Sequence, residues 1–166
     1  MSMSRTVQDA LNQQINAELE ASYEYLAMSA WCTSQNLLGS AKWLRLQSQE
    51  ESGHAMKLYD FVLARGGEVV LKEMPAPSQK FKNLHDVFDR VLKQEQSVSH
   101  QIDALYELAF KEKAFSATVE LQWFLTEQVE EEKSAREIVA TLALIGADPA
   151  GLLDFDRELG SRTTAE

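Results

Sequence analysis

The chain of 166 residues contains little that would interrupt a helix or cross-link a fold: seven glycines, three prolines and one cysteine, Cys32. A single cysteine cannot form an internal disulfide, which fits a reducing compartment. No apolar run approaches the roughly 18 residues of a membrane span, and residues 1–6 carry no signal-peptide pattern. We therefore expect a cytoplasmic protein without a membrane partner.

The sequence also lacks an excess of basic residues, since its formal net charge is −10. A nucleic-acid-binding protein needs a basic surface to meet the phosphate backbone, so this charge argues against a nucleic-acid partner. An acidic surface is compatible with attracting cations, although it usually serves solubility alone. The charge therefore argues against one class of protein and selects no other.

Helix-forming residues dominate what remains, and the apolar residues recur with helical periodicity. The pattern predicts one all-α domain, residues 1–166, with helices at about 4–35, 39–65, 84–112, 116–145 and 149–159. In the first segment the apolar stripe comprises Val7, Leu11, Ile15, Leu19 and Leu26. Asp148 and Pro149 form a start signal for the short last helix, and the tail from Gly160 is expected to be disordered.

The joins between the predicted helices differ in length. Short joins near residues 36–38 and 113–115 predict antiparallel neighbours. The join at residues 66–82 is much longer, and its 17 residues reach about 55 Å when extended, whereas the second helix is roughly 40 Å long. This join can therefore run the height of a four-helix bundle and leave the second and third helices parallel.

Polar residues interrupt the apolar stripe of each long helix near its middle. These residues are Glu18, Glu51, His54, Glu95, Gln128 and Glu131. They form three pairs with a common offset of 77 positions: Glu18 with Glu95, Glu51 with Gln128, and His54 with Glu131. The chain is thus built like two similar helical hairpins, and we expect the inward polar groups to meet at one level.

Four buried carboxylates without partners would be costly, and they would protonate rather than stay charged. Two divalent cations would balance the four negative charges of the glutamates. Two trivalent ions bridged by one oxide would balance them equally, so the cage is neutral before and after a two-electron oxidation. Oxygen ligands with one imidazole suit Fe and Mn, and less specifically Zn. The sequence therefore predicts a two-metal centre in the core.

Four stretches of the chain match motifs of a known family. They are Asn16–Glu20, Met28–Cys32, Gln49–His54 and Trp123–Lys133. With them, the chain from Val7 to Leu159 resembles the ferritin family, specifically the non-haem bacterial ferritins. The resemblance implies a ferritin-like four-helix bundle with a long crossover between helices two and three and a short fifth C-terminal helix. It also implies self-assembly into a 24-subunit shell.

The resemblance further implies which residues bind iron. The first iron site of the family corresponds to Glu18, Glu51 and His54, with Glu51 bridging the two ions. The second site corresponds to Glu95 and Glu131, with Gln128 beside it. A nearby third iron site of bacterial ferritins corresponds to Glu50, Glu127 and Glu130, with Glu131 shared. Iron is then expected at two positions of a di-iron centre and at a possible third site.

Two aromatic residues and one departure from a related pattern complete the resemblance. Tyr25 and Trp123 match aromatic residues beside the di-iron centre, where each is a candidate electron donor, although both also suit ordinary core packing. Bacterioferritins have a haem-binding methionine two residues before the histidine of helix two, where this chain has Ser52. We therefore expect no haem.

The implied activity is that of a ferroxidase, which oxidises Fe(II) to Fe(III) with O2 or H2O2 and deposits ferric mineral in a hollow shell for iron storage and detoxification. A second interpretation is a di-iron oxidase or peroxidase that stores nothing. Rubrerythrin-like proteins of that kind usually carry a Cys-x-x-Cys module, which Cys32 alone cannot supply. A third is a helical interaction module whose inward acids are incidental, and the common offset argues against it.

Overall fold

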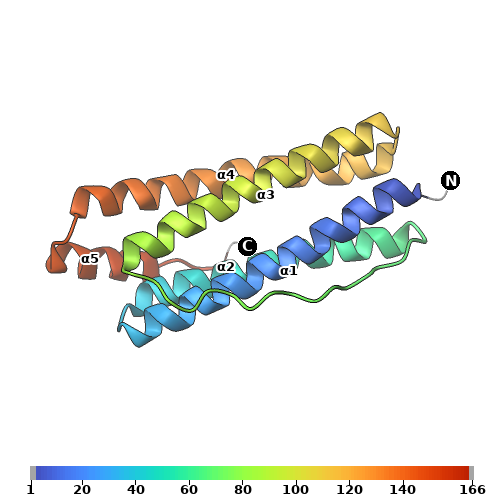
Figure 1. Cartoon of the computed structure of the whole chain (residues 1–166). Coiled ribbons are helices and arrows are strands. Elements are labelled where there is room, and N and C mark those ends of the chain that lie inside the picture. Colours follow the sequence, from blue (N-terminus) through green and yellow to red (C-terminus); the bar gives the residue numbers. More distant parts are fainter. Residues whose placement is uncertain (1–2, 165–166) are drawn as a thin grey trace.

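A computed structural model describes residues 3–164, which form five α-helices and no strand. The helices are α1 (Arg5–Ser34), α2 (Leu38–Ala64), α3 (Leu84–Lys111), α4 (Phe115–Ile145) and α5 (Pro149–Gly160) (Figure 1). Each helix begins and ends within one residue of the bounds predicted from the sequence. Within the described range, none of these helices combines the length and the apolar character needed to cross a membrane.

Local signals explain several of these bounds. The N-caps of α1, α3 and α5 are Ser4, Asn83 and Asp148, and each side chain accepts a hydrogen bond from the N–H three residues further on. Gly66 and Gly146 follow the ends of α2 and α4 with φ of 70° and 61°. Only glycine adopts this left-handed conformation without cost, so both helices end where the sequence places a glycine.

The helices form a four-helix bundle, in which α1 pairs with α2 and α3 pairs with α4 as antiparallel hairpins (Figure 1). The long connection runs the length of the bundle beside α1, so α2 and α3 are parallel, as predicted. Two asparagines of α1 hold the connection in place. Asn12 donates to the carbonyl of Glu68 at 2.8 Å and accepts from the N–H of Val70 at 2.7 Å. Asn16 bonds the connection in the same way one turn later, with Val70 O and Lys72 N.

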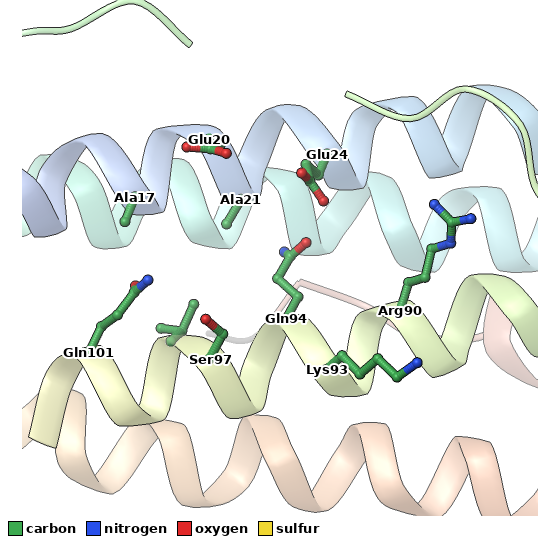
Figure 2. Close-up of a pocket in the computed structure, with 10 residues that line it drawn as sticks. Ala17, Glu20, Ala21, Glu24, Arg90, Lys93, Gln94, Ser97 and Gln101 are labelled. Carbon is green, nitrogen blue, oxygen red and sulfur yellow. The ribbon is translucent and has the colours of Figure 1, made fainter. Parts of the chain in front are cut away.

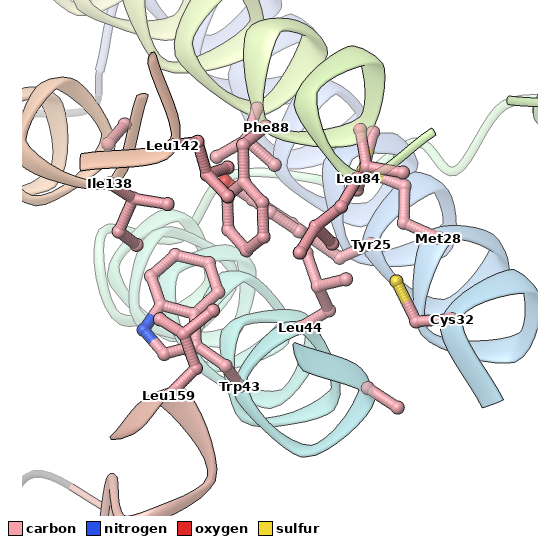
Figure 3. Packing of buried hydrophobic residues seen from close by; sticks show 14 of the residues in the cluster. Tyr25, Met28, Cys32, Trp43, Leu44, Leu84, Phe88, Ile138, Leu142 and Leu159 are labelled. Atoms are coloured by element: carbon pink, nitrogen blue, oxygen red, sulfur yellow. The ribbon is translucent and has the colours of Figure 1, made fainter. Parts of the chain in front are cut away.

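The apolar core is divided into two clusters, one toward each end of the bundle. The first is shown in Figure 3 and includes Tyr25, Leu44, Phe88, Ile138 and Leu142. The second includes Leu11, Ile15, Leu58, Ile102 and Leu121. On every long helix, the predicted inward polar residues lie between the residues of these two clusters. The two apolar clusters therefore enclose a polar layer at mid-height.

Helix α5 packs against the start of α2. Asp156 is buried and its carboxylate accepts hydrogen bonds from the N–H groups of Gly39 and Ser40 and from the Ser40 hydroxyl, at 2.6–3.0 Å. The backbones approach so closely at Gly39 that an added Cβ would lie 1.6 Å from the carbonyl oxygen of Asp156. The carboxylate and the glycine together lock α5 onto the first turn of α2.

Two expectations from the sequence are wrong. Leu26 is 47% exposed rather than part of the core stripe, because its neighbour Tyr25 takes the inward position. The tail was expected to be disordered from Gly160, but α5 extends through that residue and Arg162 is bonded to α2. Residues 165 and 166 of that tail lie outside the described residues.

Candidate metal centre

The polar layer collects all six residues predicted to face inward. None of them is more than 8% exposed, and Glu18 and Glu51 are completely buried. They come from all four long helices: Glu18 from α1, Glu51 and His54 from α2, Glu95 from α3, and Gln128 and Glu131 from α4. The six inward residues therefore lie at one level of the bundle, as the sequence predicted.

One half of the layer is formed by α1 and α2. Glu18, Glu51 and His54 each offer a ligand atom, and these atoms lie within 4.8 Å of one another. His54 Nδ1 is 3.2 Å from Glu51 Oε2. The amide of Gln14 donates to Glu18 Oε1 at 2.8 Å, whereas Glu18 Oε2 is buried without a hydrogen-bond partner. An unpartnered carboxylate oxygen among other acids is a position that a cation would satisfy.

The other half is formed by α3 and α4, with Tyr25 reaching in from α1. The Tyr25 hydroxyl donates a hydrogen bond to Glu95 Oε1. The amide of Gln128 donates to Glu95 Oε2 at 3.2 Å and lies equally close to the Ser99 hydroxyl. Glu95 is thus oriented by two hydrogen-bond donors, the Tyr25 hydroxyl from α1 and the amide nitrogen of Gln128 from α4.

Gln47 joins the two halves. Its amide nitrogen donates to Glu131 Oε2 at 2.7 Å and lies 3.4 Å from Glu51 Oε1, and the side chain is fully buried. Gln47 and Gln14 are not among the site residues predicted from the sequence. A signal was present, because each glutamine lies four residues before a site glutamate on the same helix face, Gln14 before Glu18 and Gln47 before Glu51.

The three acids expected at a third site are in different situations. Glu127 offers a ligand atom within 4.8 Å of those of His54 and Glu131. Glu50 is paired with Arg162 at 2.7 Å. Glu130 is largely exposed and lies 3.9 Å from Lys133. The structure therefore brings Glu127 to the centre, holds Glu50 in an ion pair and leaves Glu130 at the surface.

Burial and mutual repulsion raise the pKa values of the carboxyl groups in the layer. Burial and the charge of Glu51 raise the pKa of Glu18 well above its usual range, and burial and Glu95 do the same for Glu51. Burial raises the pKa of Glu95, against the hydrogen bonds from Tyr25 and Gln128. Burial, with Glu95 and Glu50, raises the pKa of Glu131 to about 8. Without cations the layer therefore holds protons at neutral pH.

Aromatic rings close one side of the centre. The indole of Trp123 meets the His54 ring edge-on, with the ring centroids 5.2 Å apart, and is itself 41% exposed. Lys57 lies 5.0 Å above the same indole and pairs with Glu120 at 3.3 Å. Tyr25, by contrast, is fully buried beside Glu95. Tyr25 and Trp123 therefore both adjoin the centre, Tyr25 inside it and Trp123 at the surface.

The chain matches the sequence model of the ferritin-like domain over residues 8–145, a span that contains the entire polar layer. The chain belongs to the ferritin family. Among curated relatives of this family member, a probable bacterial non-heme ferritin-like protein of Haemophilus influenzae is 36% identical and covers 98% of both chains. A bacterial non-heme ferritin of Staphylococcus saprophyticus is also 36% identical, over 99% of this chain and 98% of its own length.

Solved ferritin structures share the fold over the whole length of the chain. An open pore ferritin from the hyperthermophilic archaeon Archaeoglobus fulgidus is 44% identical, with a TM-score of 0.96 over 98% of this chain and 100% of the other. An engineered closed form of the same ferritin gives a TM-score of 0.97 over 99% of this chain. The ferritin-like four-helix bundle with a short C-terminal helix is thereby established.

A groove of about 360 Å³ between α1 and α3 is separate from the centre (Figure 2). Glu20 and Glu24 lie on its α1 side, and Arg90, Lys93 and Gln94 on its α3 side. Burial and the charge of Glu20 raise the pKa of Glu24. The groove carries charges of both signs and none of the six inward residues lines it, so Glu20 and Glu24 lie outside the polar layer.

We predict that the metal-free protein loses stability as pH rises from about 5 to about 8. The folded pKa of Glu131 is about 8 and its ordinary value is 4.5, so in this window the folded chain binds more protons than the unfolded chain. Stability contributed by the protonated carboxyl is complete below pH 4.5 and is lost as pH rises through 8. The melting temperature of metal-free protein, measured by calorimetry across this range, should fall, and Zn(II) should restore it by replacing the protons. A melting temperature that is level or rising without metal would contradict the prediction.

Proposed function

We propose that this protein stores iron and oxidises Fe(II) to Fe(III) at a di-iron centre within each subunit. The observation that carries the proposal is the buried layer of four glutamates and one histidine at the junction of four helices. Buried acids that repel one another are expensive unless cations bind between them. Carboxylate oxygens with one imidazole suit iron among the abundant metals, and membership of the ferritin family favours iron over manganese or zinc.

In this proposal the first Fe(II) is bound by Glu18, Glu51 and His54, whose ligand atoms already lie together. The second is bound by Glu95 and Glu131, with Gln128 beside it and Glu51 between the two ions. Two Fe(II) ions release two electrons, enough to reduce O2 to H2O2 or H2O2 to water. Glu127, Glu50 and Glu130 would receive iron at a third site as it leaves. Ser52 replaces the haem-binding methionine of bacterioferritins, so no haem is proposed.

Storage requires a closed assembly, and we propose a 24-subunit shell. Support comes from the full-length similarity to ferritins and from apolar side chains that one subunit alone leaves exposed. These include Phe110, Phe115, Val119, Val129 and Leu144, of which Leu144 is 90% exposed. Apolar side chains of this size usually become buried when such a surface meets a partner. A second copy of the chain is the partner that a symmetric shell supplies.

Two measurements test this function together. Metal-free protein titrated anaerobically with Fe(II) should bind at least two ions per subunit, and gel filtration under native conditions should give a species of shell size. A species of monomer or dimer size that still binds and oxidises two Fe(II) would support the non-storing di-iron oxidase instead. Failure to bind a metal pair would overturn the site. The absence of a Soret absorption band should accompany the expected result.

We propose that Tyr25 donates an electron during oxidation, because its hydroxyl is bonded to Glu95 in the centre. Tyr25→Phe should slow Fe(II) oxidation by about tenfold, the lower end for residues that support metal ligands. It should leave the number of Fe(II) ions bound unchanged, because the ligands remain. Stopped-flow absorbance and anaerobic titration measure the two quantities. An unchanged rate, with no tyrosyl radical in the wild type, would limit Tyr25 to packing.

A further inference from the structure

Arg162 brings a positive charge from the C-terminal segment to the edge of the polar layer. The segment follows α5 and returns to α2, as the coloured trace after α5 shows in Figure 1. One guanidinium nitrogen donates to Glu50 Oε2 at 2.7 Å, and another donates to Gln47 Oε1 at 2.9 Å. The guanidinium also lies 4.7 Å above the ring of Trp43. Only 23% of the side chain is exposed, so the ion pair is largely shielded from water.

The carboxylate that Arg162 holds belongs to the proposed third iron site. Glu50 is close enough to Glu131 for its charge to raise the pKa of that residue. Glu127, on α4, offers a ligand atom to the same region as Glu131. A cation bound between these acids would draw on Glu50, but the guanidinium already occupies one of its oxygens. Arg162 and an incoming metal ion therefore compete for one carboxylate.

The packing of Arg162 explains why the pair persists in a surface segment. The indole of Trp43 supports the flat face of the guanidinium, and Gln47 accepts from its edge. Because Gln47 Oε1 is turned to Arg162, the amide nitrogen is turned to Glu131 and Glu51. The buried side chain of Gln47 thus connects Arg162 of the C-terminal segment to the acids of the centre.

We infer that Arg162 is an internal counter-ion that lowers the affinity of the third site by neutralising Glu50. Iron would bind Glu50 only when Arg162 releases this carboxylate. Arg162 therefore controls how often the third site is occupied and takes no part in the oxidation itself. The inference rests on the proposed function and deepens it. Its physical basis is that a fixed positive charge beside a ligand both repels a cation and occupies a lone pair.

The test is the binding of Zn(II), which is not oxidised, to metal-free protein by isothermal titration calorimetry. Arg162→Gln should leave the first two sites in place and tighten a third by about tenfold, the effect of one partly screened charge a few ångströms away. The double variant Arg162→Gln with Glu50→Gln should lose that gain. Glu50→Gln alone should weaken the third site, because it removes one carboxylate and leaves the positive charge of Arg162 unpaired beside the remaining acids.

Arg157→Gln is the matched control, since it removes the same charge from α5 at a side chain that is 77% exposed and paired with Asp154. It should leave all sites unchanged. An unchanged or weaker third site in Arg162→Gln would overturn the inference and leave Arg162 as a clip for α5. Should Arg162→Gln fail to fold, Arg162→Met replaces it, because this variant keeps an aliphatic stem against Trp43 and removes the charge. It should tighten the third site by the same factor, and an unchanged third site would overturn the inference. Absence of the first two sites would instead overturn the proposed function.

Discussion

Glu51→Ala and His54→Ala are each expected to lower the rate of Fe(II) oxidation by at least about 100-fold. Loss of a residue that merely supports a ligand costs 10–100-fold, and a ligand should cost no less. Glu51 is the central acid of the layer. One of its oxygens lies within 4.8 Å of the ligand atoms of Glu18 and His54, and the charges of Glu95 and Glu131 raise its pKa. His54 is the one imidazole among the six inward residues and the nitrogen ligand that we propose. Stopped-flow absorbance at saturating Fe(II) measures the rate.

The stability of the metal-free Glu51→Ala variant separates loss of chemistry from loss of fold. The carboxyl is disfavoured as a charge where it lies, so its removal should leave the melting temperature unchanged or higher. Asp60→Ala on the same helix and His100→Ala on α3 are matched controls, because both side chains are exposed and lie outside the layer. Both controls should oxidise Fe(II) at the wild-type rate. Unchanged oxidation in both site variants would mean that the site has been wrongly assigned.

Gly39→Ala is expected to lower the free energy of unfolding by about 3 kcal/mol, the upper range for a residue forced into packed structure. The added Cβ would lie 1.6 Å from the Asp156 carbonyl oxygen and 3.0 Å from the Gly160 nitrogen. Both are backbone atoms of α5, so no side chain can move aside and the helix itself must shift. In a chain of this size the melting temperature should fall by roughly 10 °C. Differential scanning calorimetry measures the change.

Gly53→Ala, on the same helix, should have the opposite effect. An added Cβ at Gly53 meets nothing within 4 Å, and alanine is the better helix former by about 1 kcal/mol. The two variants therefore make the same substitution, glycine to alanine, with opposite expected effects on the free energy of unfolding. The difference between the two free energies measures the contribution of the close approach between α2 and α5. Equal effects on stability would show that α5 does not depend on the close approach at Gly39.

The bounds of the helices and the six inward residues were predictable because both follow from local periodicity. A residue every three or four positions faces the same side of a helix, so a glutamate on that side is recognisable without knowing what it meets. Periodicity alone does not decide between neighbouring apolar residues such as Tyr25 and Leu26. Tyr25 and Leu26 are adjacent and only one can face the core, and the packing of the finished bundle places the tyrosine inside.

The partners of the inward residues were less accessible. The roles of Gln14 and Gln47 are not predictable from the sequence, because a buried glutamine can be interpreted only when its acceptor is known. Both nevertheless precede a glutamate of the layer by one turn. Arg162 was assigned to a disordered tail, since no pattern in residues 160–164 predicts order. Its partners Gln47 and Glu50 lie 115 and 112 positions away, and such contacts leave no local signal.

The sequence by itself determined five helices, a duplicated hairpin and a layer of acids with one histidine, because hydrophobic periodicity and the cost of buried charge act on each helix separately. Only the tertiary structure decided which side chains form hydrogen bonds and ion pairs with that layer. The rotation and height of helices from distant parts of the chain place Tyr25 on Glu95, Gln47 between Glu51 and Glu131, and Arg162 on Glu50. These relations depend on how the helices pack against one another, which no single helix encodes.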